Sequence, residues 1–95
     1  MTGDGAPPPL DRAAIAELVQ RELAEILEKR PADIALDATF EELGADSLAL
    51  IELVEALEEQ LANAVAGFHI DDADLEGLRS VHDAVEYVSS KLQVS

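Results

Sequence analysis

Three stretches of this chain place aliphatic side chains at the three- and four-residue spacing of an α-helix, and no stretch shows the two-residue alternation of a strand. The sequence has two Phe, one Tyr and no Trp, so a core must be built from aliphatic side chains. Abundant Ala, Leu and Glu also favour helices over a sheet. We therefore predict an all-α fold, a small bundle of three main helices and one short helix.

The first main helix is expected to begin at Asp11, a good N-cap, and to end at Pro31. Leu10 can pack on Ile15 as a hydrophobic staple. Residues at helical spacing form a single apolar stripe, consisting of Ile15, Leu18, Val19, Leu23, Ile26 and Leu27. Residues 1–9 form a Gly- and Pro-containing segment that we interpret as a flexible lead-in to a domain covering residues 10–93.

The second main helix is expected to begin at Asp46 as N-cap and to fade over residues 63–67. Its predicted buried stripe consists of Leu50, Ile51, Val54, Leu57, Leu61 and Val65. A second stripe at the same spacing is almost wholly acidic and consists of Leu48, Glu52, Glu55 and Glu59.

Between these two helices, residues 31–45 lack a helical period and are predicted to form a long ordered loop with one helical turn at 39–43. The expected apolar anchors of this loop are Ile34, Leu36, Phe40 and Leu43. A short helix is expected at residues 72–75. The last main helix is expected to open with a capping box of Ser80 and Asp83 and to bury Val81, Ala84, Val85, Val88 and Leu92.

Charge and composition exclude several functions. The 95 residues include 21 acidic and 6 basic side chains, for a formal net charge of -15. A phosphate backbone or an anionic membrane would repel such a chain, so basic patches on other proteins are the expected partners. No cysteine is present, and no stretch resembles a secretory signal or a membrane span. We expect a cytoplasmic protein and a monomer.

An enzymatic function is not expected. His69 and His82 are the only imidazoles, the sequence around Ser47 lacks the second Gly of a nucleophile elbow, and no Gly-rich phosphate loop is present. A calcium loop is a weak alternative. Asp72 and Asp74 occupy the first ligand positions, with Asp83 at the twelfth, where a longer Glu is required. We expect a solvated acidic turn there and no metal site.

Residues 44–48, GADSL, place the Ser47 hydroxyl at the start of the second helix, where free N–H groups and the helix dipole favour an attached anion. The neighbouring Asp46 carboxylate can help to hold a metal-bound nucleotide substrate while that hydroxyl is modified. From helix logic alone, the favoured interpretation of Ser47 is an ordinary residue of a well-capped first turn.

Residues 40–59, FEELGADSLALIELVEALEE, resemble those of an acyl carrier protein, and the similarity extends from about residue 12 to residue 92. The order of the elements, the long loop before the serine and the closing segment 80–88 belong to the same resemblance. Ala45 and Asp46 favour the acyl class, because peptidyl carriers usually have a second Gly and a His before the serine.

The resemblance implies that Ser47 carries 4′-phosphopantetheine, transferred from coenzyme A by a phosphopantetheinyl transferase that uses Mg²⁺. The thiol of this arm then holds acyl groups as thioesters, and the carrier itself catalyses nothing. Leu48 becomes an apolar contact at the base of the arm. The carboxylates of Glu52, Glu55 and Glu59 become contacts for basic patches on the transferase, an acyltransferase, a ketosynthase and other acyl-processing enzymes. The interior beside the second helix can open for an acyl chain.

Some residues differ from those that are usual in acyl carrier proteins. Residues 62–66 resemble an insertion of about one helical turn, residues 70–72 lack the usual proline, and His82 replaces a smaller residue. Together with residues 48–50, LAL, and the Pro-rich lead-in, these features resemble discrete carriers of polyketide biosynthesis. Fatty-acid synthesis is the alternative pathway.

Overall fold

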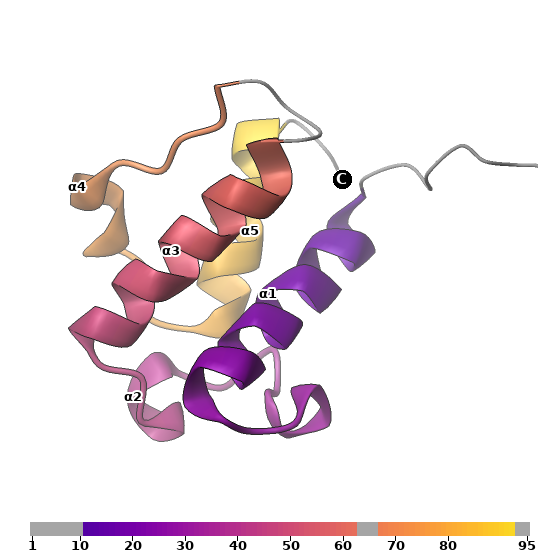
Figure 1. Cartoon of the computed structure of the whole chain (residues 1–95), viewed down its shortest axis with the longest axis vertical. Helices are drawn as coiled ribbons and strands as arrows, with labels where there is room; N and C mark the ends of the chain where they lie inside the picture. Colours follow the sequence, from indigo (N-terminus) through magenta and orange to yellow (C-terminus); the bar gives the residue numbers. More distant parts are fainter. Residues whose placement is uncertain (1–10, 63–66, 93–95) are drawn as a thin grey trace, which may run out of the picture.

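The computed structural model describes residues 11–62 and 67–92 (Figure 1). Its elements are α1 (Arg12–Leu27), a 3-10 turn (Pro31–Asp33), α2 (Phe40–Leu43), α3 (Ser47–Ala62), α4 (Asp72–Leu75) and α5 (Val81–Leu92). The three long helices α1, α3 and α5 and the short α4 confirm the predicted bundle, and α2 is the single turn expected in the long loop. Leu10, Val65, the expected lead-in and most of the proposed insertion lie outside the described residues.

Helix α1 packs against both α3 and α5, so the apolar stripes of the three long helices meet in one core. The side chains that are almost fully removed from solvent are Ile15, Val19, Leu23, Ile34, Leu57, Leu61, Val81 and Val88. All of them are aliphatic, as the scarcity of aromatic residues predicted. Among the described residues, no helix is long and apolar enough to cross a membrane.

Helix α1 begins as predicted but ends earlier than predicted. The Asp11 side chain accepts a hydrogen bond from the Ala14 N–H at 2.9 Å, which confirms the N-cap. The helix ends at Leu27 because Glu28 adopts a left-handed conformation with φ 57°, and its N–H bonds to the carbonyls of Ala24 and Glu25. Pro31 therefore does not end the helix; it opens the following 3-10 turn, where its fixed φ is suitable.

The buried face of α3 differs from the predicted stripe. Ala49 and Leu53 are buried, whereas Ile51 is 46% exposed and Leu50 is only partly buried. Val54, Leu57 and Leu61 are buried as predicted. The core includes the four-residue row Ala49, Leu53, Leu57 and Leu61, with Val54 beside it. Apolar residues also occupy the adjacent row, so the sequence offers two overlapping stripes, and packing against α1 selects the row that includes the small Ala49.

The segment between α1 and α3 is joined to the beginning of α5 by backbone hydrogen bonds. The N–H of Phe40 donates to the Arg79 carbonyl, the N–H of Val81 to that of Ala38, and the N–H of His82 to that of Leu36. Ile34 and Phe40 are buried anchors, as expected. Leu36 is not one, because its side chain is 43% exposed while its backbone makes the contact.

A capping box fixes α2 within this segment. Thr39 Oγ1 accepts a hydrogen bond from the Glu42 N–H, and Glu42 Oε1 accepts bonds from the Thr39 N–H and from the Thr39 hydroxyl. The two bonds that Glu42 accepts lower the pKa of its carboxyl.

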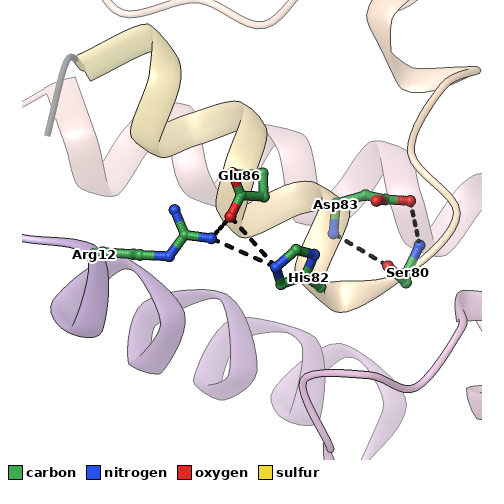
Figure 2. Close-up of polar contacts among 5 residues, drawn as sticks. All are labelled: Arg12, Ser80, His82, Asp83 and Glu86. Carbon is green, nitrogen blue, oxygen red and sulfur yellow. Dashed lines mark hydrogen bonds and ion pairs between the residues drawn. The ribbon is translucent and has the colours of Figure 1, made fainter. Parts of the chain in front are cut away.

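The capping box predicted for α5 is present. Ser80 Oγ accepts from the Asp83 N–H at 3.1 Å, and Asp83 Oδ2 accepts from the Ser80 N–H at 3.2 Å (Figure 2). Of the five residues predicted to be buried in this helix, Leu92 is only half-buried, and the small Ser89 is buried instead.

A polar cluster on one side connects α1 to α5. Arg12 forms an ion pair with Glu86, and His82 Nε2 lies 3.3 Å from Glu86 Oε2 (Figure 2). His82, a departure noted in the sequence, thus contributes to the contact between the first and last helices.

Candidate functional site

Ser47 is the first residue of α3, and its side chain is exposed. The chain reaches it through a tight turn at the end of α2, where Gly44 has φ 78°. An L-residue is strained at this angle, so glycine suits the position. The next residue, Ala45, is buried and its N–H donates to the Phe40 carbonyl at 2.8 Å. The turn is therefore fixed to the core immediately before the serine.

Asp46 is the N-cap of α3, as predicted. Its Oδ1 accepts a hydrogen bond from the Ala49 N–H at 2.9 Å, and its carbonyl accepts from Leu50. The amides of Ser47 and Leu48 have no backbone acceptor in the part of the chain that the structure describes. They form the positive end of a 16-residue helix, and such an end stabilises an anion bound to the first residue.

A cleft of about 500 Å³ opens beside the serine. It is lined by Ser47, Leu50, Ile51, Leu75, Glu76 and Leu78. Leu50 and Ile51, which the sequence assigned to the core, are thus partly exposed because they form one wall of this cleft. The opposite wall consists of Leu75, the last residue of α4, and of Glu76 and Leu78, which follow that helix. The sequence analysis missed this wall, because no local pattern links residues 75–78 to Ser47.

The predicted contact residues on α3 are all exposed. Leu48 is 64% exposed, and it lies outside the set that lines the cleft. Glu52, Glu55 and Glu59 are exposed along the same helix. Helix α3 therefore carries Ser47, the exposed apolar side chains of Leu48 and Ile51, and a row of exposed carboxylates.

Comparison with known proteins shows which family has this arrangement. Residues 17–88 match the family described as "Phosphopantetheine attachment site". An acyl carrier protein of Clostridium perfringens is 41% identical over 68 residues, which cover 70% of this chain and 83% of the relative. An acyl carrier protein of Nitratidesulfovibrio vulgaris is 38% identical over 79 residues, covering 82% and 97% of the two chains. This chain belongs to the acyl carrier proteins.

The fold of this acyl carrier protein is also that of a solved relative. A crystal structure of a free-standing peptidyl carrier protein from an uncharacterized secondary metabolic pathway of Acinetobacter baumannii aligns with a TM-score of 0.73 and 21% identity. The alignment covers 86% of this chain and 96% of that one. At this identity the likeness shows the shared fold, and it supports the four-helix carrier architecture predicted from the sequence.

Phosphopantetheine is therefore the cofactor of this acyl carrier protein, and the described residues suit such a group. An exposed hydroxyl, free backbone N–H groups for a phosphodiester and an adjacent apolar cleft occur together at the start of α3. A carrier presents its cargo to other enzymes.

Two of the three carboxylates named for the calcium alternative make hydrogen bonds within the protein. Asp83 Oδ2 accepts hydrogen bonds from the Arg79 and Ser80 N–H groups, and Asp74 Oδ2 accepts one from the Tyr87 hydroxyl at 2.6 Å. Both carboxylates are thus engaged in holding the backbone and a side chain. Among the described residues, no three or more His, Cys, Asp or Glu side chains are arranged to hold a metal ion.

Proposed function

We propose that this protein carries acyl intermediates as thioesters on a 4′-phosphopantetheine arm attached to Ser47, in the biosynthesis of a polyketide or a related specialised metabolite. The observation that supports it most directly is the exposed Ser47 hydroxyl at the N-terminus of α3, on the rim of the cleft and within the matched family region. The arm supplies the thiol that the cysteine-free chain lacks.

Attachment at Ser47 has a physical rationale in the first turn of α3. A phosphodiester on the serine oxygen lies at the positive end of the helix, next to the amides of Ser47 and Leu48. The Asp46 carboxylate is exposed, so its second oxygen is accessible to the Mg²⁺ that accompanies coenzyme A in the transferase. Leu48 offers an apolar contact at the base of the arm.

The cleft accommodates the first carbons of the acyl chain. Its lining includes four aliphatic side chains, Leu50, Ile51, Leu75 and Leu78, and Ser47 stands at its edge. A short aliphatic chain that folds back from the arm would pass from water onto this apolar surface. Each buried methylene would contribute about 0.8 kcal/mol of favourable free energy.

Partner enzymes approach the acidic side of α3. Glu52, Glu55 and Glu59 present exposed carboxylates beyond Ser47, so a basic patch next to a partner's active-site entrance is complementary to them. The expected partners are the phosphopantetheinyl transferase, an acyltransferase and a ketosynthase. Rim charges of this kind raise the rate of encounter more than the lifetime of the complex, which suits a carrier that must be released.

Intact mass spectrometry tests the attachment. The protein is incubated with a promiscuous phosphopantetheinyl transferase, coenzyme A and Mg²⁺, beside Ser47→Ala and the matched control Ser90→Ala, which changes an exposed serine on α5. We expect a gain of one phosphopantetheine in the wild type and in Ser90→Ala only. A gain in Ser47→Ala, or none in folded wild-type protein that starts unmodified, would contradict the proposal.

The pathway is tested with the loaded carrier. The phosphopantetheine form is offered to a ketosynthase of polyketide biosynthesis and to one of fatty-acid synthesis, and kcat/KM is measured for each. We expect a preference of about tenfold for the polyketide enzyme, corresponding to about 1.4 kcal/mol of differential transition-state binding. The reverse preference would assign the protein to fatty-acid synthesis.

A further inference from the structure

The cleft beside Ser47 has one firm wall and one weakly held wall. The α3 wall belongs to a 16-residue helix whose row of buried side chains packs into the core. The other wall includes Leu75 and Glu76, at the end of α4, which is a single turn of four residues. In that turn Ala73 is exposed, and Asp74 and Leu75 are only half-buried.

The described contacts of α4 show what holds it in place. Its N-cap, Asp71, makes no side-chain capping bond. The chain just before it is anchored to α3, because Ile70 is buried and its N–H donates to Glu58 Oε2 at 2.8 Å. Within α4 itself, Asp74 Oδ2 accepts a hydrogen bond of 2.6 Å from the Tyr87 hydroxyl on α5.

The Tyr87–Asp74 bond is short and partly shielded from water. Tyr87 is half-buried, and its ring packs against the core. Burial and, after it, the bond to Asp74 raise the pKa of Tyr87 to about 12, so the hydroxyl remains a donor at any physiological pH.

We propose that the Tyr87–Asp74 hydrogen bond fixes α4 at its present distance from α3, and that Tyr87 is thereby a positioning residue which limits the length of the acyl chain that the cleft accepts. The inference rests on the proposed attachment of the cargo at Ser47. Tyr87 is not among the residues that line the cleft; it acts through Asp74, the neighbour of the cleft residue Leu75. Without the bond, α4 is held only by the Ile70 anchor and by the packing of Leu75 on the core, so it can move farther outward and the cleft admits a longer chain.

A chemical-protection experiment tests this inference. Butyryl and octanoyl forms are prepared with the transferase from the corresponding acyl-coenzyme A, and thioester cleavage by hydroxylamine is timed. An inserted chain draws its thioester toward the protein and slows cleavage. We expect Tyr87→Phe to lower the ratio of the octanoyl to the butyryl cleavage rate by about threefold or more, because each additional buried methylene favours insertion about fourfold.

Companion variants separate positioning from general loss of stability. Asp74→Asn keeps an acceptor for the Tyr87 hydroxyl and is expected to retain the wild-type ratio, whereas Asp74→Ala is expected to match Tyr87→Phe. The double variant Tyr87→Phe/Asp74→Ala should show no further change, since one bond is lost in each case. Gln20→Met is the matched control. It removes a 2.6 Å side-chain bond to the Ile34 carbonyl, away from the cleft, and should lower stability without altering the ratio.

The outcomes are distinguishable. If wild-type protein is not loaded at Ser47, the proposed function fails and this inference fails with it. If loading is complete and the rate ratio of Tyr87→Phe equals that of the wild type, or if Gln20→Met shifts the ratio as much, the positioning role alone is overturned. The positioning role is supported if Tyr87→Phe and Asp74→Ala both lower the ratio of octanoyl to butyryl cleavage rates while Asp74→Asn keeps the wild-type ratio.

Discussion

The Asp46 carboxylate accepts a hydrogen bond from the Ala49 N–H at 2.9 Å and so closes the first turn of α3 around Ser47. One side chain thus has two separable properties, a capping oxygen and a negative charge. Asp46→Asn keeps the cap and removes the charge, whereas Asp46→Ala removes both.

We expect Asp46→Ala to lower the free energy of unfolding by about 1 kcal/mol and Asp46→Asn to leave it within a few tenths. Both should slow phosphopantetheine transfer if the charge helps to hold Mg²⁺. Denaturant melts and initial transfer rates measure the two effects. Normal transfer in Asp46→Asn would show that Asp46 serves only as the cap.

The exposed carboxylates of α3 are expected to increase the rate at which partner enzymes associate with the carrier. Glu52→Lys/Glu55→Lys should lower kcat/KM for the transferase by about tenfold at low salt, mainly through KM, with a smaller effect at high salt. The control Glu17→Lys/Glu25→Lys changes the net charge equally on exposed positions of α1. An equal loss in the control would show that total charge, not the α3 side, governs the encounter.

If Asp83 serves in the Ser80–Asp83 capping box, its contribution to stability should not depend on calcium. Asp83→Ala removes an acceptor for the Arg79 and Ser80 N–H groups and should destabilise the protein by about 1–2 kcal/mol. Because this role is structural, the loss should be the same in chelator and in millimolar calcium. Thermal melts in both media measure it, and a loss confined to the calcium sample would revive the metal-binding alternative.

The raised pKa of Tyr87 makes a prediction about alkaline stability. Its value in the folded protein is about 12, and that of an exposed tyrosine is about 10. Between these pH values the unfolded chain has lost a proton that the folded chain retains, so folding stability falls as the pH rises through this window. Below the window the contribution is fully present.

Tyr87→Phe removes this titration and the hydrogen bond together. We expect it to cost about 1–2 kcal/mol at pH 8 and to lose less stability than the wild type between pH 10 and 12. Urea unfolding across the pH series tests both parts. Parallel stability curves for the two proteins would mean that Tyr87 ionises normally in the folded state.

Much of the architecture followed from local patterns. Asp11, Asp46 and Ser80 each cap the helix that the sequence assigned to them, because an N-cap depends on residues only three positions apart. The end of α1 did not follow, since Glu28 adopts its left-handed conformation without the glycine that usually signals one.

The residues of the candidate site also fall into those that local sequence patterns could predict and those that they could not. The sequence could propose Ser47 and the carboxylates of α3 as candidates because they lie within one motif and one helix. The far wall of the cleft and the Tyr87–Asp74 bond were not found, because they depend on how segments distant in the sequence pack. Ile51 was misplaced for a related reason: local periodicity cannot choose between two overlapping apolar rows when the neighbouring helix decides.

The backbone bonds from residues 36–40 to residues 79–82 have a consequence for synthesis of the chain on the ribosome. The segment that leads into Ser47 has local contacts of its own, but these partners on α5 become available only after the polypeptide has been extended beyond residue 82. A nascent chain that ends earlier keeps the local turn before the serine and lacks its connection to the last helix. If Ser47 is the modified residue, as proposed, its approach is therefore complete only in a chain that already includes the beginning of α5.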